Sequence, residues 1–387
     1  MRSIAVTVAR GLPPEAAVGL PVLRRRPGEP LRIAQVAPLI ESVPPTRYGG
    51  TERVVAYLSE ALTALGHEVT LFASADSRAA VPIAACCPRA LREDAAACDP
   101  GLWSVLQLRR LLDRAGHFDM VHFHSGYVHF LLDERLPPYV TTMHGRLDRD
   151  PAEFYARHAA PLVSISAAQR TPLPHVNWAG TVHHGLPRDL LRPGPGGDYL
   201  AFVGRLSREK RVDSAIEIAR RAGLPLKIIA KIDAADALYV EREVRHLLDA
   251  PGVEFLGEGD EKAKQALLGG AAALLFPIDW PEPFGLVMIE ALACATPVIA
   301  FRRGSVPEVV EHGRTGFVVD SIDEAVAAVG RLGTLDRATC RAEFERRFTA
   351  ERMARDYERV YRDILERRAA LPEDPAQEIP SWPRHPS

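Results

Sequence analysis

Residues 276–297 read FPIDWPEPFGLVMIEALACATP, and this stretch decides the fold class. It overlaps the short apolar run 272–276, which is typical of a buried strand when a proline ends it. Gly285 then opens a helix that the apolar pattern predicts to run to Ala295. The first N–H groups of such a helix have no partner within it, so its start suits a phosphate. A strand, a loop and a helix in this order indicate one βα unit of a parallel sheet.

The alternation of strands and helices continues on both sides of this unit. Further short apolar runs predict strands at 199–203, 226–230, 253–256 and 297–300, and helical patterns begin near Val212 and cover 261–268. The first half of the chain repeats the pattern, with strands at 31–37, 67–73, 118–123, 139–143 and 162–166 and a helix over 51–65. Both halves therefore predict doubly wound α/β domains with parallel sheets.

The chain is long enough for two such domains. Its 387 residues exceed the size at which one hydrophobic core keeps growing, and 187–198 holds three prolines and three glycines, which is typical of a linker. We expect one Rossmann-like domain over 31–190 and a second over 191–349, facing each other across a cleft. The helical stretch 350–370 has no strand after it, so we expect it to pack back on the first domain.

Both ends of the chain are predicted to lie outside the folded domains. Residues 1–30 contain scattered prolines, and Arg24, Arg25 and Arg26 follow the apolar stretches instead of preceding them, which does not fit a secretory signal. We expect a disordered extension over 1–30 and a flexible tail over 371–387.

Composition excludes several classes of function. The net charge is −2, so no basic field for nucleic acid is present. The longest apolar runs are far shorter than the roughly 20 residues that span a bilayer, although contact with a membrane surface stays open. The five cysteines show neither CxxC spacing nor a nearby histidine pair, so we expect no structural metal and a cytoplasmic location. The oligomeric state stays unknown.

Two glutamates in the opening stretch are candidate ligand-binding residues. Glu282 lies in the loop and Glu290 lies about a turn and a half into the helix, with seven residues between them. Both carboxylates are therefore expected to face one crevice at different depths, and a carboxylate can accept two hydroxyl protons from a ribose diol. A lone glutamate on a helix, by contrast, is more often a surface charge.

A basic turn follows the strand at 199–203. Arg205 and Lys210 could neutralise a diphosphate there from two directions, because arginine offers a planar fork and lysine a compact ammonium. The alternative is a solvated loop. The chain has only five lysines against 43 arginines, and all five lie between Lys210 and Lys264. The presence of a lysine at this turn therefore modestly favours a functional role for Lys210 over a solvated loop.

Glycines and histidines mark the first domain. Gly49 and Gly50 follow its first strand, where open α/β sheets bind ligands, and glycine lets the backbone approach a ligand closely. His122 and His124 alternate along the strand at 118–123, and His144 follows the strand at 139–143. Buried, hydrogen-bonded histidines are the simpler interpretation, and metal binding is the rarer alternative.

Residues 269–319 resemble the retaining glycosyltransferases of family 4, which have the GT-B fold, and the similarity extends from Leu31 to about Leu365. The spacing of Glu282 and Glu290 matches the Glu-x7-Glu motif of that family. The resemblance implies that Glu290 binds the ribose hydroxyls of the donor and that Glu282 lies beside the donor sugar. It also implies that no metal is bound.

The resemblance assigns roles to further residues. Arg205 and Lys210 stand where the family carries its leaving-group cations, and His124 is our choice for the histidine near the reacting sugar. The residues expected to contact the donor are Gly49, Gly50, Phe284, Gly285, Leu286, His144 and Lys231. Among them, Lys231 is expected to lie near the nucleobase. One departure from the family is Ala295, because relatives commonly have glycine before the Thr-Pro pair.

The predicted function is transfer of a sugar, with retention of configuration, from a nucleoside-diphosphate sugar to an acceptor hydroxyl. A UDP-sugar is favoured as the donor, and GDP-mannose is the second option. The acceptor could be a polysaccharide, a lipid-linked sugar or a small molecule. Two alternatives stay open: a nucleotide-sugar epimerase of the same fold, and a protein that binds nucleotide sugars without catalysis. No cofactor is expected besides the nucleotide-sugar substrate.

Overall fold

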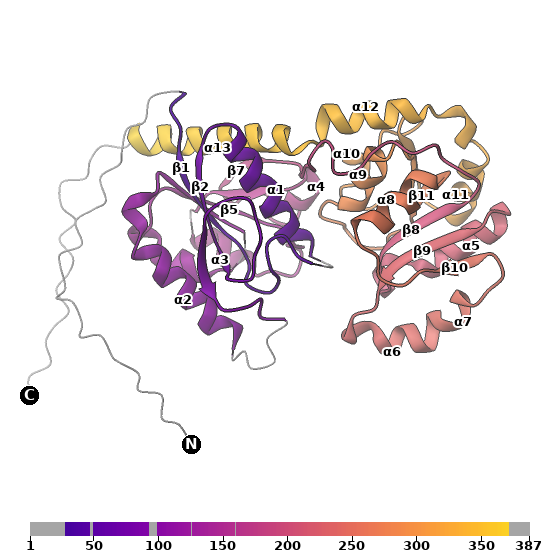
Figure 1. The fold of residues 1–387 in the computed structure, drawn as a ribbon, viewed down its shortest axis with the longest axis horizontal. Coiled ribbons are helices and arrows are strands. Elements are labelled where there is room, and N and C mark those ends of the chain that lie inside the picture. Colours follow the sequence, from indigo (N-terminus) through magenta and orange to yellow (C-terminus); the bar gives the residue numbers. More distant parts are fainter. Residues whose placement is uncertain (1–27, 47–48, 93–98, 125, 159, 371–387) are drawn as a thin grey trace, which may run out of the picture.

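The chain forms two α/β lobes that lie side by side (Figure 1). The computed structural model describes residues 28–46, 49–92, 99–124, 126–158 and 160–370. The predicted extension up to residue 27 and the predicted tail 371–387 lie outside the described residues.

The first lobe is built on a seven-stranded parallel sheet with the order β3-β2-β1-β4-β5-β6-β7. The strands are β1 (Arg32–Val36), β2 (Glu68–Ser74), β3 (Ile83–Cys87), β4 (Met120–Phe123), β5 (Tyr139–Thr142), β6 (Leu162–Ser164) and β7 (Trp178–Thr181). The α-helices are α1 (Gly50–Ala64), α2 (Pro100–Leu112), α3 (Ala152–Arg157) and α4 (Ala167–Arg170). The strand order reverses between β1 and β4, and such a switch point opens a crevice at the carboxyl ends of the strands.

The second lobe has a six-stranded parallel sheet with the order β10-β9-β8-β11-β12-β13. Its strands are β8 (Leu200–Arg205), β9 (Leu226–Lys231), β10 (Val253–Phe255), β11 (Ala273–Phe276), β12 (Val298–Phe301) and β13 (Gly316–Val319). Its α-helices are α5 (Val212–Ala222), α6 (Ala237–Tyr239), α7 (Arg245–Leu248), α8 (Glu261–Gly270), α9 (Leu286–Ala293), α10 (Val306–Val309), α11 (Ile322–Val329) and α12 (Arg337–Arg347). The switch point here lies between β8 and β11.

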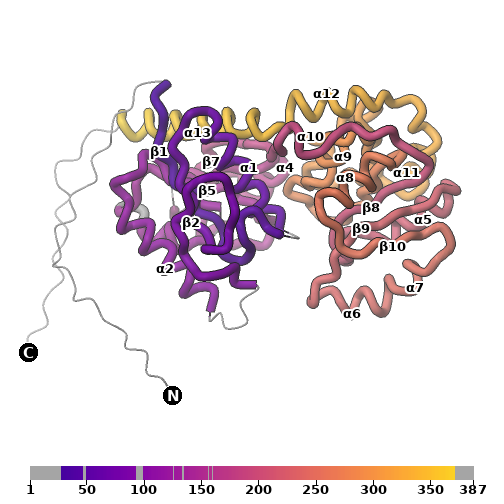
Figure 2. Tube along the Cα trace, viewed as in Figure 1, coloured from indigo at the N-terminus to yellow at the C-terminus, as the bar shows by residue number. Residues whose placement is uncertain are grey.

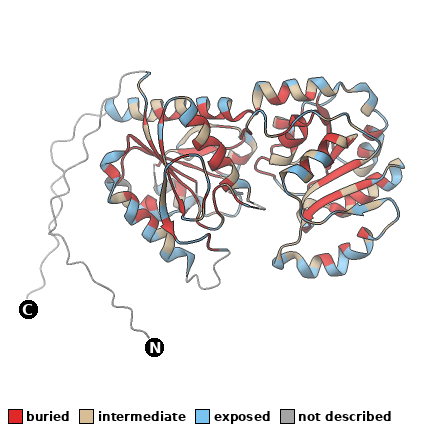
Figure 3. Cartoon of the chain, in the orientation of Figure 1, coloured by how far each residue is buried: buried red, intermediate tan, exposed pale blue. Residues whose placement is uncertain are grey.

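The predicted α/β class with two Rossmann-like domains is confirmed. The central strands were predictable because they are buried on both faces, as every residue of β11 and β12 is (Figure 3). The strands that the sequence did not predict, β3, β7 and β13, all lie at sheet edges. β3 and β7 are only partly buried, and their sequences, IAACC and WAGT, consist mostly of small residues. Helices α2, α11 and α12 were also not predicted.

The linker between the lobes is packed tightly against the second lobe. The N–H of Gly194 donates to the carbonyl of Cys294 (3.0 Å), and that of Gly196 donates to the carbonyl of Gly269 (2.9 Å). A Cβ atom on Gly194 would lie 2.3 Å from the backbone of Gly269. Glycine is therefore required at this position by close backbone approach, not by flexibility.

The last helix, α13 (Ala350–Ala370), returns to the first lobe and lies against α1 (Figures 1 and 2). The chain thus crosses between the lobes twice, and the two crossings pair. The N–H of Leu186 donates to the carbonyl of Phe348 (2.9 Å), and that of Ala350 donates to the carbonyl of Leu186 (2.8 Å). This paired crossing is the hinge between the lobes.

Candidate functional site

A cavity of about 410 Å³ lies between the lobes, where strands from both sheets end. Its walls include residues at the carboxyl ends of β8, β9 and β11, and residues that follow β1 and β5. Open α/β sheets bind ligands at this edge. The cavity is therefore the candidate site.

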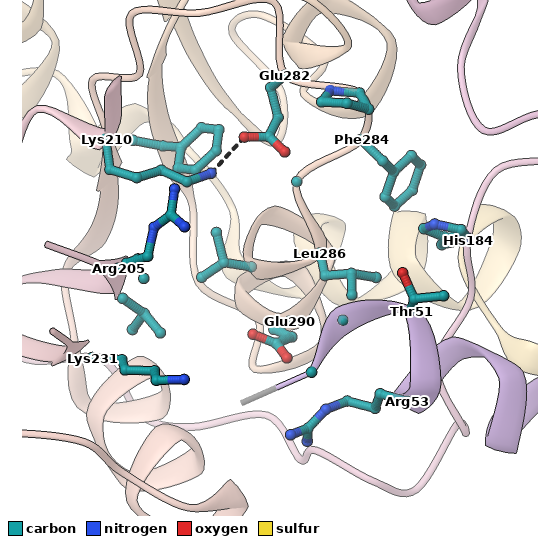
Figure 4. Close-up of a pocket in the computed structure, with 18 of the residues that line it drawn as sticks. Thr51, Arg53, His184, Arg205, Lys210, Lys231, Glu282, Phe284, Leu286 and Glu290 are labelled. Carbon is teal, nitrogen blue, oxygen red and sulfur yellow. Dashed lines mark hydrogen bonds and ion pairs between the residues drawn. The ribbon is translucent and has the colours of Figure 1, made fainter. Parts of the chain in front are cut away.

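Eleven of the twelve predicted site residues line this cavity. They are Gly49, Gly50, His144, Arg205, Lys210, Lys231, Glu282, Phe284, Gly285, Leu286 and Glu290. Figure 4 shows Arg205 between Lys210 and Lys231, with Glu282 next to Lys210. Glu290 extends from α9. The exception is His124, described below.

Glu282 is held in a fixed position beside a lysine. Its Oε2 atom accepts from Lys210 Nζ at 2.5 Å and from the indole Nε1 of Trp280 at 2.8 Å, and the residue is buried. The backbone N–H of Ser305 donates to the carbonyl of Glu282 (3.0 Å), and Gly304 packs directly against the Glu282 backbone. The carboxylate is thus positioned by both side-chain and backbone contacts.

The start of α9 brings the two lobes into contact. Gly285 adopts a left-handed conformation (φ 77°) and caps the helix, and a Cβ atom on it would lie 2.8 Å from Met288. Both facts explain the glycine. Across the cleft, the position of a Cβ on Gly50 is 3.6 Å from Leu286. The glycine loop of the first lobe therefore faces the N-terminus of α9.

Glu290, at the base of the cavity, is paired with a lysine that the sequence reasoning missed. Lys264 Nζ lies 2.5 Å from Glu290 Oε1 and 3.2 Å from Glu261 Oε1. Glu261 in turn forms an ion pair with Arg53 of the first lobe. A signal was available, because Lys264 belongs to the cluster of lysines in an arginine-rich chain. The pairs form a chain of alternating charges from α1 to Glu290.

Arg205 and Lys231 are held by carboxylates of the second lobe. Arg205 forms ion pairs with Glu209, Asp233 and Asp236, and Lys231 Nζ lies 3.0 Å from Asp233. Burial acts to raise the pKa of Asp233, but the hydrogen bond from Lys231 and the charges of Lys231 and Arg205 lower it overall. The carboxylate therefore stays ionised and fixes both cations at the cavity wall.

His124 is not among the residues that line the cavity, and its place beside the reacting sugar stays a prediction. The side chain is buried behind His144, whose Nε2 lies 3.0 Å from His124 Nδ1, and the Nε2 of His124 contacts Oε1 of Gln35 at 2.6 Å. His124 directly follows β4, and its two ring nitrogens are both occupied by these neighbours. His144, and His184 beside it, are the histidines at the wall.

A second, more polar cavity adjoins the first and shares Trp280 with it. Its lining consists entirely of charged and aromatic side chains, namely Arg146, Arg149, Arg208, Glu209, Arg211, Asp213, Tyr239, Glu243, Asp279 and Trp280. The guanidinium of Arg146 lies 5.0 Å from the centre of the Trp280 ring, so both lobes contribute. The two cavities therefore meet at Trp280.

Among the described residues, no three His, Cys, Asp or Glu side chains are grouped as a metal site requires, and the expectation that no metal is bound stays a prediction. Within the same ranges, no helix is both long enough and apolar enough to cross a bilayer.

Comparisons with known proteins match both lobes. The model of Glycosyltransferase Family 4 matches residues 48–182, and the model of Glycosyl transferases group 1 matches residues 191–338. Glycogen synthase of Mycobacterium tuberculosis (strain ATCC 25618 / H37Rv) is 28% identical over 372 residues, which cover 81% of this chain and 89% of that protein.

Solved structures share the arrangement of the two lobes. AviGT4, a glycosyltransferase involved in Avilamycin A biosynthesis, has a TM-score of 0.69 and 25% identity over 87% of this chain and 98% of its own. Alr3699/HepE of Anabaena, solved in complex with UDP and glucose, has a TM-score of 0.67 and 17% identity over 86% of this chain and all of its own. The second similarity concerns the fold alone.

Proposed function

The chain belongs to glycosyltransferase family 4, and on this premise we propose that it transfers a sugar, with retention of configuration, from a nucleoside-diphosphate sugar to an acceptor hydroxyl. The observation that carries the proposal is the row of cations Arg205, Lys210 and Lys231 along one wall, facing the start of α9. A diphosphate placed there would meet positive charge from two sides. The carboxylate of Glu290 would lie within reach of the ribose hydroxyls.

In the proposed reaction the bond between the anomeric carbon and the diphosphate oxygen breaks, and the electron pair stays on that oxygen. Arg205 and Lys210 stabilise the charge that develops there. The acceptor hydroxyl attacks the anomeric carbon from the same face, and its proton passes to the departing phosphate oxygen. The protein contributes charge stabilisation, positioning and exclusion of water by closure of the lobes.

A UDP-sugar is the favoured donor and GDP-mannose the second option. The Anabaena protein that shares this fold was solved with UDP and glucose, so a UDP-sugar is the first donor to test. The acceptor would enter through the second cavity, whose charged and aromatic lining suits a polar molecule. A polysaccharide, a lipid-linked sugar and a small molecule remain the acceptor classes.

A cytoplasmic location and a reaction without a metal cofactor belong to the same proposal. Cys86, Cys294 and Cys340 are free and buried, which suits a reducing compartment. In this proposal Arg205, Lys210 and Lys231 stabilise the charge of the diphosphate, which a metal ion would otherwise do.

The test is turnover of UDP-, GDP- and ADP-sugars by Arg205→Ala and Lys210→Ala variants, measured as release of the nucleoside diphosphate with and without candidate acceptors. Loss of either cation should lower kcat by about 100-fold or more. Lys227→Ala, which changes a half-buried lysine of β9 that is paired with Glu254 on β10 and does not line the cavity, is the control. Turnover near the wild-type rate in both cavity variants would refute this account of the leaving group.

The same assay separates the alternatives. A nucleotide-sugar epimerase would convert the donor into a second nucleotide sugar without any acceptor and without releasing diphosphate. A protein that only binds the nucleotide sugar would change neither the donor nor the acceptor.

A further inference from the structure

The carboxylate of Glu308, on α10 of the second lobe, bonds to the first lobe. Its Oε2 atom accepts from the backbone N–H of Ala167 and its Oε1 atom from that of Ala168, both at 2.8 Å. His183, also of the first lobe, places its Nε2 atom 3.1 Å from Oε2. Burial acts to raise the pKa of Glu308, but the hydrogen bonds from His183, Ala167 and Ala168 lower it overall. The carboxylate is therefore ionised and bridges the lobes.

The start of α4 is capped from both lobes. The first N–H groups of a helix have no partner within it. Ser166 supplies one partner from its own lobe, because its Oγ atom accepts from the N–H of Gln169 (3.0 Å). Glu308 supplies partners for the N–H groups of Ala167 and Ala168 from the other lobe. Figures 1 and 2 show α4 and α10 next to each other where the lobes join.

Helix α4 in turn holds a wall of the cavity. Gln169 is buried, its Oε1 atom accepts from the N–H of Ile165 (2.9 Å), and its Nε2 atom donates to the carbonyls of Met143 (2.8 Å) and Gly145 (2.7 Å). Because both carbonyls can only accept, the orientation of the Gln169 amide is fixed. His144 lies between the two carbonyls and lines the cavity, as Gly145 and Ile165 do.

On the other side, α10 is attached to the loop that carries Glu282. The N–H of Ser305 donates to the carbonyl of Glu282 (3.0 Å), and Ser305 Oγ donates to the carbonyl of Phe284 (2.8 Å). The carbonyl of Glu308 itself accepts from Arg347 at the end of α12. Short connections thus lead from Glu308 to loop 282–284 in one lobe and to loop 143–145 in the other.

We infer that Glu308 is a positioning residue, which sets the distance across the cleft between loop 282–284 and loop 143–145. Glu308 is not among the residues that line the cavity, so it acts through these loops. The inference rests on the proposed function, in which the sugar lies between both walls and a small displacement of one wall slows the reaction. Arg205 and Glu290, assigned to the diphosphate and the ribose, both lie in the second lobe, so donor binding should not depend on Glu308.

The first test is the kinetics of Glu308→Gln, which replaces one acceptor oxygen by an NH₂ group that faces an N–H donor. With saturating donor, kcat should fall about tenfold, whereas the Kd for UDP should change by less than about twofold. Glu311→Gln is the matched control, because Glu311 is exposed and pairs with Arg314 of its own lobe, and it should change neither quantity. A loss of UDP affinity equal to the loss of kcat would overturn the inference.

The same contact can be broken from the first lobe. Ala167→Pro removes one N–H donor, and proline is tolerated at the first position of a helix. Ser166 already has the extended backbone (φ −157°, ψ 162°) that the residue before a proline favours. This variant should therefore fold and should also lower kcat about tenfold. If kcat stays at the wild-type value in both Ala167→Pro and Glu308→Gln, Glu308 is not a positioning residue.

A double-mutant cycle tests the route through α4. Gln169→Met keeps a side chain of similar size but cannot hold the carbonyls of loop 143–145, so it should lower kcat by itself. In that background, Glu308→Gln should lower kcat by less than about a further twofold, because both residues act on the same loop. A further tenfold loss would mean that Glu308 acts by another route, against the inference.

Hydrogen exchange tests the contact without any turnover. In the full-length protein, the amides of Ala167 and Ala168 should exchange at least about tenfold faster in Glu308→Gln than in the wild type or in Glu311→Gln. Unchanged exchange would overturn the inference and leave the proposed function intact. If the wild type turns over no nucleotide sugar, the proposed function fails, and the exchange rates still decide whether Glu308 joins the two lobes.

Discussion

Lys264 Nζ lies 2.5 Å from Oε1 of Glu290, and both side chains are buried at the base of the cavity. The pair links Glu290, the residue assigned to ribose binding, to helix α8 of the same lobe. Lys264 also pairs with Glu261, which in turn pairs with Arg53 of the other lobe. Ionised carboxylates are rarely buried without a partner. Lys264 therefore holds the Glu290 carboxylate in place.

Replacing Lys264 tests this relationship. In Lys264→Met the Glu290 carboxylate loses the cation that holds it in place, so that it no longer presents both oxygens to the ribose hydroxyls. UDP binding measured by calorimetry should weaken by about tenfold or more, and the free energy of unfolding should fall by roughly 3 kcal/mol. Lys262→Met, an exposed residue of the same helix, should change neither quantity. Unchanged UDP affinity in Lys264→Met would remove Lys264 from the site.

Gly304 should be required for the position of Glu282. Its φ is +51°, and an added Cβ would lie 2.3 Å from the Glu282 carbonyl oxygen and 2.4 Å from its nitrogen. Gly304→Ala should therefore displace the Glu282 loop and lower kcat by at least tenfold. Gly313→Ala separates crowding from backbone strain, because Gly313 also has a positive φ (+77°) but open space around it. Equal activity of the two variants would contradict the argument.

Ala295 stands where relatives commonly have glycine, and the structure gives the physical reason. It adopts a φ of +61° directly after α9, where its N–H donates to the Leu292 carbonyl (3.0 Å). This left-handed turn favours glycine. Ala295→Gly should raise the free energy of unfolding by about 1 kcal/mol, as measured by urea unfolding. Ala327→Gly, at an exposed position inside α11, should lower it by about 1 kcal/mol.

The ion pair between Arg53 and Glu261 should favour the closed arrangement of the lobes. Glu261→Gln weakens it, which should increase the radius of gyration in solution scattering and weaken UDP binding by about threefold to tenfold. Added UDP should restore the compact form. Glu241→Gln breaks an exposed pair within the second lobe and serves as the control. A radius of gyration identical to that of the wild type would mean that this pair does not hold the lobes together.

Buried histidines should make the protein sensitive to mild acid. Burial lowers the pKa of His129 and of His144 to about 3, and the pKa values of His122, His124 and His184 are also lowered. Below about pH 6.5 the unfolded chain binds protons that the folded chain does not, so stability falls as the pH falls. Each such histidine should remove about 2 kcal/mol between pH 7.5 and pH 5.

Urea unfolding at several pH values measures this slope. His129→Gln removes one of the titrating groups and should make the slope shallower, whereas His246→Gln, which changes an exposed histidine of α7, should not. A slope that is the same in wild type and His129→Gln would show that His129 binds protons equally in both states.

Much of the candidate site could be predicted because its residues occupy fixed places in βα units. Arg205 and Lys231 end strands, Gly285 opens a helix, and Glu290 follows Glu282 at a set spacing. The carboxyl ends of parallel strands converge on one edge of each sheet, so local pattern alone brought these residues together. The sequence does not tell which of two neighbouring strand ends lines the cavity, so it could not show that His144 lies at the wall and His124 next to it.

The sequence by itself determined the alternation of strands and helices, the two-lobed architecture and the motif that places two glutamates beside a helix start, because each depends on residues close together in the chain. Only the tertiary structure decided the partners of those residues. The Lys264–Glu290 pair, the Arg53–Glu261 contact across the cleft and the line from Tyr361 through Gln35 and His124 to His144 join residues 20 to 326 positions apart. Such contacts arise from the packing of whole elements, which no local periodicity encodes.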